Sequence, residues 1–326
     1  MKKWILSLFV LLVVGVLAAC GDDSDANKVK IGYFPNIDHA PAMVAKEKGY
    51  FQEALGEDVE IEYVTFPDGG TFMTALNSGE IDAGLVGPAP VLNNYSNGAD
   101  VKIIGGASSG GTVVVASKES GINSLEDIEG KTFITPGIGC THDVQFEKFL
   151  LEKGIDKLAS DRIGGSLKHT TGKPATYQGL FESGQVDLAA VPEPWASILV
   201  DKGAKVVVST EEIAYGETLP NVVLAASGSL LEDRPEIAKA ILEAEERAVE
   251  YINNNKEEAL DITIKAIKDI TKQELDKDLM AKAMERITYT TEIDEDLLKE
   301  FGHASFELEF LKEKPNFDGI VVSNIN

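Results

Sequence analysis

The chain has 326 residues with 54 acidic and 30 basic side chains, and its formal net charge at pH 7 is −24. So acidic a surface repels nucleic acid and anionic lipid, which excludes both as partners held by charge. At this length a single hydrophobic core gives way to two, so we expect two lobes.

The first segment of the chain is typical of a secretory signal. Lys2 and Lys3 precede an apolar run, residues 4–19, that is short for a membrane span of about 20 residues. The run ends in Leu-Ala-Ala-Cys at residues 17–20, which resembles a bacterial lipobox. We therefore predict a signal peptide over 1–19 and a lipid, such as palmitate, on Cys20. An uncleaved anchor helix is the alternative.

This interpretation also sets the compartment. Residues 20–27 would form a flexible tether, and the protein would sit on the extracytoplasmic face of the cell membrane, attached through its lipid anchor only. The only other cysteine is Cys140, so a lipidated Cys20 leaves no pair to form a disulfide.

Beyond the tether, predicted strands and helices alternate. Ser124, with Asp127 three residues later, is a variant of the capping box, and Thr141 is the expected N-cap of its helix. Alternation of this kind predicts an α/β fold. In chain order we expect a strand at 29–34, a helix at 39–51, a strand at 59–66, a helix near 70–77, strands at 81–87, 101–108 and 112–117, a short helix at 124–130, a strand at 131–137, a helix at 141–154, strands at 186–191, 205–210 and 222–227, a helix at 234–252, and further helices to about residue 311.

One motif occurs twice. SGEIDAGLVGPAP at 78–90 matches SGQVDLAAVPEPW at 183–195 without a gap, 105 positions later, and the same offset aligns Lys48-Gly49 with Lys153-Gly154. Ligands of open α/β sheets bind beyond the carboxyl ends of the strands. We therefore expect Gly87-Pro88 and Pro192-Glu193, which follow matched strands, to meet at one cleft between two facing halves. The alternative is a strand–turn pattern common to α/β proteins.

Four segments together resemble a known family. They are YFPNIDHAPAMVAKEKGYF (33–51), SGEIDAGLVGPAPVLNNYSNGADVKIIGGASSGGTVVV (78–115), SGINSLEDIEGKTFITPGIGCTHDVQF (120–146) and VDLAAVPEPWAS (186–197). The chain resembles, over roughly residues 28–255, the solute-binding proteins of ABC importers in the nitrate/sulfonate/taurine group, which includes relatives that bind thiamine-pyrimidine precursors. One departure is the sequence Gly-Cys-Thr-His-Asp at 139–143, where relatives commonly carry Gly-Asn-Thr-Gln-Asp.

The resemblance implies a two-lobed periplasmic-binding-protein fold of type II, with a mixed sheet flanked by helices in each lobe. Lobe 1 would comprise residues 28–115 and 220–326, lobe 2 residues 116–219, with hinge crossings near 116–119 and 219–227. It also implies a monomer that binds a small-molecule solute without a cofactor and delivers it to a permease and an ATPase on separate chains. No GxSxG motif or phosphate loop occurs, so we expect no enzyme activity.

Helix starts on the two halves suggest how a ligand would be held. Free N–H groups and the helix dipole favour anions there, and His39, Thr141 and His142 add hydrogen-bond donors. Trp195 offers an apolar face, and Glu193 suits a cationic end. The full predicted ligand-binding set is Asn36, His39, Gly87, Pro88, Ser108, Ser109, Gly110, Cys140, Thr141, His142, Glu193 and Trp195.

Other interpretations of these residues stay open. The two histidines could only cap helices, Trp195 could be core, and Glu193 could form a lobe-closing salt bridge. A zinc site is a further alternative, with His39, Cys140, His142 and Glu193 as ligands, although helix starts disfavour cations. We therefore expect a small organic anion such as an aliphatic sulfonate or taurine, or a related nitrate- or bicarbonate-type solute; a thiamine-pyrimidine-like heterocycle or zinc is the alternative.

Overall fold

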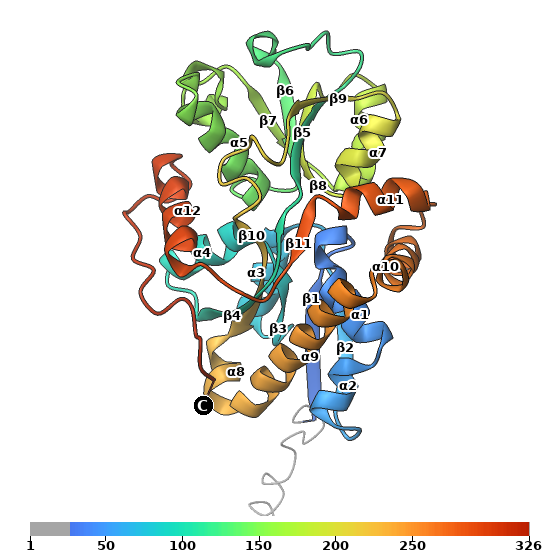
Figure 1. Cartoon of the computed structure of the whole chain (residues 1–326). Helices are drawn as coiled ribbons and strands as arrows, with labels where there is room; N and C mark the ends of the chain where they lie inside the picture. The colour runs from blue at the N-terminus through green and yellow to red at the C-terminus, as the bar shows by residue number, and fades with distance from the viewer. Residues whose placement is uncertain (1–26, 326) are drawn as a thin grey trace, which may run out of the picture.

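The structure, a computed structural model, describes residues 27–325 and arranges them in two lobes, each built on one sheet (Figure 1). The predicted signal peptide, Cys20 and the tether up to residue 26 lie outside the described residues. In the described part of the chain, no helix is both long and apolar enough to cross a membrane. The predicted α/β fold with a mixed sheet in each lobe is confirmed.

The first lobe contains a six-stranded sheet in the order β11-β4-β10-β3-β1-β2. β1 pairs in parallel with β2 and β3, whereas β10 runs antiparallel to both of its neighbours. The strands are β1 (Lys28–Tyr33), β2 (Glu60–Thr65), β3 (Ala83–Val86), β4 (Val101–Gly110), β10 (Pro220–Ser227) and β11 (Ile287–Tyr289).

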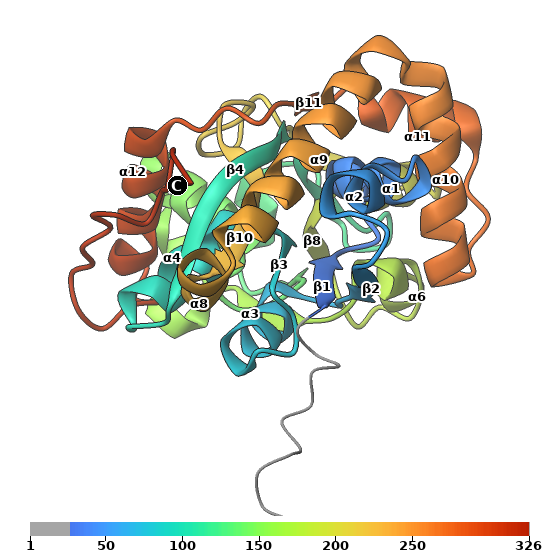
Figure 2. The same ribbon diagram turned by 90° about the horizontal axis from the view of Figure 1, so that it is seen from below.

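Helices cover both faces of this sheet (Figure 2). Side chains of α1, α2 and α9 form one core with the sheet, and those of α3, α4 and α12 form the other. The helices of this lobe are η1 (Ile37–His39), α1 (Ala40–Glu47), α2 (Tyr50–Leu55), α3 (Gly69–Ser78), α4 (Pro88–Ser96), α8 (Gly228–Asp233), α9 (Pro235–Asn254), α10 (Lys256–Thr271), α11 (Lys277–Met284) and α12 (Glu295–Glu307).

The second lobe contains a five-stranded sheet in the order β7-β6-β8-β5-β9. Its strands are β5 (Thr112–Ala116), β6 (Thr132–Thr135), β7 (Lys168–Thr171), β8 (Leu188–Pro192) and β9 (Lys205–Val208). Its helices are α5 (Thr141–Glu152), α6 (Tyr177–Glu182) and α7 (Trp195–Asp201), with short 3-10 turns at η2 (Leu125–Ile128), η3 (Asp156–Leu158), η4 (Asp161–Ile163) and η5 (Pro174–Thr176).

The chain crosses between the lobes earlier than we predicted. β4 belongs to the first sheet and β5 to the second, so the first crossing is at Gly110 and Gly111, both of which have positive φ (80° and 85°). Residues 112–115 therefore belong to lobe 2, because they pair with β8 and β9. The second crossing lies between β9 and β10. Asn221 joins the two crossings, since its side-chain amide donates to the Gly110 carbonyl and to Thr112 Oγ1, each at 2.8 Å.

The repeated motif has the same structural role in both lobes. Gly79 and Gly184 end α3 and α6 with φ of 74° and 68°, where glycine avoids the strain of a side chain. Three residues later, Asp82 accepts a hydrogen bond from the backbone N–H of Lys30 (2.8 Å), and Asp187 accepts one from Thr132 (2.9 Å). Each aspartate thus fixes a helix-to-strand turn against the neighbouring parallel strand.

Candidate functional site

A cleft of about 480 Å³ lies between the lobes. Seven of the twelve predicted ligand-binding residues line it, and they come from both halves of the chain. These are Asn36, His39, Gly87, Cys140, Thr141, His142 and Trp195.

Several helix starts meet at this cleft. Gly87 is the N-cap of α4 in the first lobe, and Cys140 is the N-cap of α5 in the second. Asp68, the N-cap of α3, also lines the cleft. At α3 the Asp68 carboxylate already accepts from the Thr71 N–H, and in α4 Pro88 and Pro90 carry no N–H, so these two starts add mainly their dipoles. The first N–H groups of α5 have no partner within the helix, so α5 directs backbone donors as well as its positive dipole end toward the cleft. Such a space suits an anion.

Thr141 contacts the opposite lobe. We predicted it as the N-cap of α5, but Cys140 holds that position and Thr141 is the first helical residue. Its Oγ1 lies 3.4 Å from the backbone nitrogen of Ala89, near the start of α4. Gly87 permits this approach, because a Cβ there would lie 2.4 Å from Thr141 Oγ1.

Two histidines in the cleft are neutral at physiological pH. Burial lowers the pKa of His39 and of His142 to about 3, and for His39 the neighbouring His142 adds to this effect. Neither side chain forms a capping hydrogen bond within the described part of the chain. Nδ1 of His39 and Nε2 of His142 are buried without a partner among the described residues. Each ring can therefore offer one N–H to a ligand.

Aromatic side chains supply the apolar walls. Phe34 and Phe66 line the cleft, and the Phe34 ring lies 4.8 Å from the His39 ring, centroid to centroid. Trp195 is only 2% exposed, and its Nε1–H donates to Oδ1 of Asn36 at 2.7 Å. Trp195 thus combines the two roles considered from the sequence: it packs as core and borders the cleft.

Glu193 is directed away from the cleft, which corrects its predicted role at a cationic ligand end. Its fully buried carboxylate accepts hydrogen bonds from the N–H and hydroxyl of Ser197, both at 3.0 Å, and pairs with Arg286. Arg286 lies between α11 and β11 of the first lobe, and Glu193 lies in the second. Glu193 therefore forms a salt bridge between the lobes, as the alternative interpretation from the sequence proposed. Burial raises the pKa of Glu193, and Arg286 and Ser197 oppose that rise.

Four further predicted residues are absent from the cleft lining. Ser108, Ser109 and Gly110 belong to β4, which extends further than predicted, so their backbone groups face sheet and hinge partners. Ser108 Oγ donates instead to the carbonyl of Asp38 at 2.9 Å. Pro88 is the first residue of α4 and serves to start that helix.

Sequence reasoning missed eight polar residues of the lining: Asp38, Thr65, Asp68, Lys173, Thr176, Asn221, Thr271 and Gln273. Lys173 is an exposed cation beside the cleft, and Asn221 contributes a buried Oδ1 without a partner in the described structure. Asp38 is 3% exposed. A signal for Asp38 was present, because the offset of 105 pairs it with Asp143, the third residue of α5, and both are buried.

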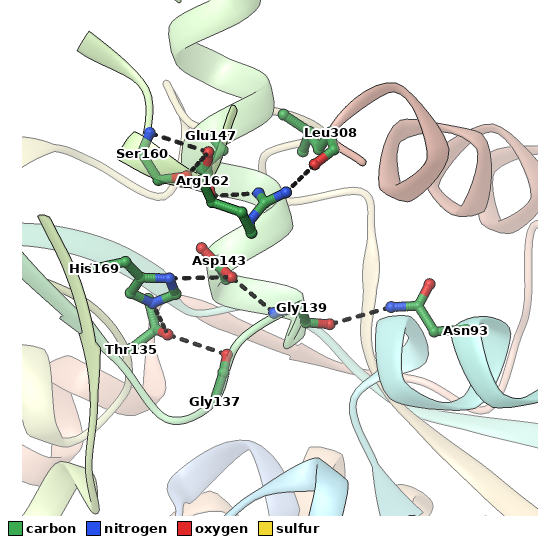
Figure 3. Close-up of polar contacts among 10 residues, drawn as sticks. All are labelled: Asn93, Thr135, Gly137, Gly139, Asp143, Glu147, Ser160, Arg162, His169 and Leu308. Atoms are coloured by element: carbon green, nitrogen blue, oxygen red, sulfur yellow. Dashed lines mark hydrogen bonds and ion pairs between the residues drawn. The ribbon is translucent and has the colours of Figure 1, made fainter. Parts of the chain in front are cut away.

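Asp143 belongs to a buried network beneath the cleft (Figure 3). Its Oδ2 accepts from the N–H of Gly139 at 2.7 Å and lies 3.7 Å from His169 Nδ1. Nε2 of His169 lies 2.7 Å from Thr135 Oγ1, which itself donates to the Gly137 carbonyl. The network holds the turn at 136–140, part of which lines the cleft.

The other end of this network reaches the first lobe. Glu147 accepts hydrogen bonds from the backbone N–H and the hydroxyl of Ser160 and from the guanidinium of Arg162 (2.9 Å). Arg162 also donates to the carbonyl of Leu308, and its guanidinium lies 3.8 Å from the centre of the Phe310 ring. Burial and the neighbouring Glu147 raise the pKa of Asp143 well above its usual value.

Among residues 27–325, one group of side chains is close enough to hold an ion: Asp143, Glu147 and His169. Arg162 already neutralises Glu147 there. The predicted set of His39, Cys140, His142 and Glu193 does not gather, and burial raises the pKa of Cys140 to about 12, which keeps it a thiol.

The two sheets, the double crossing and the cleft define the class of two-lobed periplasmic binding proteins. A solved structure from Xanthomonas axonopodis pv. citri, an alkanesulfonate-binding protein bound to MOPS, superimposes with a TM-score of 0.74 at 18% identity, over 91% of this chain and 99% of that one. A nitrate-binding protein from Synechocystis PCC 6803 gives a TM-score of 0.69 at 17% identity, over 88% and 82%.

Sequence comparison then gives the family. Residues 22–268 match the NMT1-like family, and the chain belongs to it. A relative in Bacillus subtilis (strain 168), whose name describes an aliphatic sulfonates-binding protein, is 27% identical over 92% of this chain and 87% of its own length.

Proposed function

We propose that this protein is the extracytoplasmic solute-binding component of an ABC importer and captures a small organic anion, such as an aliphatic sulfonate, taurine or a nitrate- or bicarbonate-sized solute. The observation that carries the proposal is the meeting of helix starts from both lobes at one cleft with two neutral histidines. Relatives named for sulfonates and nitrate support it.

A heterocycle of the thiamine-pyrimidine kind is the second candidate. The observation in its favour is the aromatic lining of Phe34, Phe66 and Trp195, which suits a flat ring. The two candidates differ in charge, so a matched ligand panel separates them.

The binding test uses the chain without its signal segment. Thermal shift and calorimetry would compare propane-1-sulfonate, taurine, nitrate, bicarbonate, an aminopyrimidine and Zn²⁺, with propan-1-ol as the uncharged control. A ligand at 100 times its Kd stabilises the folded state by about 2.7 kcal/mol. His142→Ala should weaken the sulfonate, whereas His303→Ala, on α12 outside the cleft lining, should not. Equal binding of propan-1-ol and the sulfonate would contradict an anion site.

The membrane attachment and the partners belong to the same proposal. We infer that Cys20 carries the lipid and that the loaded protein docks on a separate permease driven by an ATPase. Radioactive palmitate should label the wild type in cells and not Cys20→Ser. Labelling of Cys20→Ser, or wild-type protein that keeps residues 1–19, would contradict the lipoprotein assignment.

A further inference from the structure

Asp38 places a carboxyl group at the cleft, and one oxygen of this group forms no hydrogen bond with the described residues. It lines the cleft and is 3% exposed, and its Oδ1 is buried without a hydrogen-bond partner among the described residues. The residue is well fixed, because Ser108 Oγ donates to its carbonyl at 2.9 Å and Tyr289 Oη donates to the preceding carbonyl of Ile37 at 2.7 Å. A buried polar atom without a partner is costly, which makes this carboxyl group a candidate to bind a ligand in the cleft.

No positive charge compensates this carboxyl in residues 27–325, where it forms no ion pair. The ionisable groups around it are His39, which is neutral, Tyr289, whose pKa burial raises well above 10, and the carboxylate of Glu193, to which Arg286 is already bound. Burial raises the pKa of Asp38 to about 8; Glu193 adds to the rise, and the backbone N–H groups of Asp38 and His39 oppose it.

We propose that Asp38 is a ligand-binding residue that holds the anion as a neutral carboxylic acid, donating its O–H to a ligand oxygen in the closed cleft. This inference rests on the proposed function. Asp38 is buried, so water would screen little of the repulsion between an ionised Asp38 carboxylate and a bound anion. A carboxylic acid instead donates a short, strong hydrogen bond to a charged acceptor. While it keeps its proton, Asp38 would therefore disfavour ligands that present an ammonium group to this part of the cleft.

The proposal predicts a specific pH dependence. Above about pH 8 the free protein has lost the Asp38 proton, so binding of the anion must take one up. The affinity for propane-1-sulfonate should be constant from pH 6 to 7.5 and should fall about tenfold per pH unit above about pH 8. Calorimetry in buffers of different ionisation enthalpy should show proton uptake that approaches one per ligand at pH 9.

Isosteric variants separate protonation from packing. Asp38→Asn keeps an N–H donor and cannot ionise, so its affinity at pH 7 should stay within about threefold of wild type, with neither alkaline loss nor proton uptake. Asp38→Ala removes the donor and should bind more weakly at every pH. Glu245→Gln is the matched control, because Glu245 is also fully buried with a pKa of about 8 but lies on α9, outside the cleft lining. It should keep the wild-type profile.

Each other outcome overturns the inference. Affinity that rises with pH, or proton release on binding, would show an ionised Asp38 that accepts from the ligand. Alkaline loss that persists in Asp38→Asn would assign the titration to another group. If Asp38→Asn fails to fold, the absence of proton uptake by the wild type at pH 9 still counts against Asp38. If no anion binds the wild type at any pH, the proposed function fails as well; a flat profile with binding refutes only this inference.

Discussion

Nε1–H of Trp195 donates to Oδ1 of Asn36 at 2.7 Å, although the two residues belong to different lobes. Trp195 starts α7 in the second lobe, and Asn36 precedes η1 in the first. The backbone beside them adds a second bond of this kind, from Ile37 N–H to the Glu193 carbonyl at 3.1 Å. Both bonds join the lobes beside the cleft, so they stabilise the spacing of the lobes seen in this structure.

Trp195→Phe should therefore weaken ligand binding without unfolding the protein. The substitution keeps an aromatic wall but leaves the Asn36 oxygen without its donor, at a cost of about 1 to 2 kcal/mol, or roughly tenfold in Kd. Calorimetry with propane-1-sulfonate would measure it, and a double-mutant cycle with Asn36→Ala would isolate the bond. Strictly additive losses in that cycle would show that the contact does not stabilise closure.

Arg286→Ala should destabilise the protein more than it affects ligand contacts. It would leave the buried Glu193 carboxylate with only Ser197 as a partner. Breaking a fully buried pair costs about 3 to 5 kcal/mol, and because the Arg286 side chain is 42% exposed we expect a loss of about 2 kcal/mol. Urea unfolding would report the loss. Adding Glu193→Gln should recover most of it, because a neutral amide does not need the cation. A loss below about 1 kcal/mol would mean that Glu193 is already protonated in the wild type.

Glu245 should make the stability fall as the pH rises. Both of its carboxyl oxygens are buried without a partner in the described structure, and burial raises its pKa to about 8. Between pH 4.5 and 8 the folded state therefore binds more protons than the unfolded state, so the free energy of unfolding decreases toward pH 8.

Comparison with Glu245→Gln isolates this contribution from all other titrating groups. The difference in free energy of unfolding, wild type minus variant, should fall by about 1.4 kcal/mol per pH unit between about pH 5 and 8. Urea melts at four pH values suffice. Parallel profiles for the two proteins would show that water reaches the carboxyl group and that its pKa is ordinary.

Much of the fold was predictable because it follows local patterns. Strands such as β3 and β10 are apolar runs with clear ends, and the duplicated Ser-Gly-x-x-Asp sequence marks the same helix end and strand start in both lobes. The predictions failed where an element is short or gets its identity from the partner strand. β11 has three residues and forms only because β4 extends to Gly110 beside it.

The candidate site divides in the same way. Helix starts at His39 and His142 were visible in the sequence and do line the cleft. Glu193 was assigned to the ligand because its partner, Arg286, lies 93 residues later, and no local pattern links them. Asp38 was overlooked for a related reason: a carboxyl group reads as a surface residue until three-dimensional burial is known.

Gly87→Ala should block closure of the cleft while leaving each lobe folded. The backbone at Gly87 has φ −63° and ψ 147°, which any residue can adopt, so the only obstacle is space. A Cβ there would lie 2.4 Å from Thr141 Oγ1 and 3.3 Å from Thr141 Cβ, across the gap between α4 and α5. The clash exists only when the lobes are together, so the melting temperature without ligand should change little, whereas affinity for propane-1-sulfonate should fall at least tenfold.

Small-angle scattering should show that the radius of gyration no longer decreases with ligand. In a Thr141→Ala background, Gly87→Ala should cost much less, because the closest clashing atom is gone. Gly179→Ala, in α6 with nothing within 4 Å of its added Cβ, is the matched control and should bind like the wild type. Full affinity in Gly87→Ala would mean that ligand is held with the lobes further apart than they are in this structure.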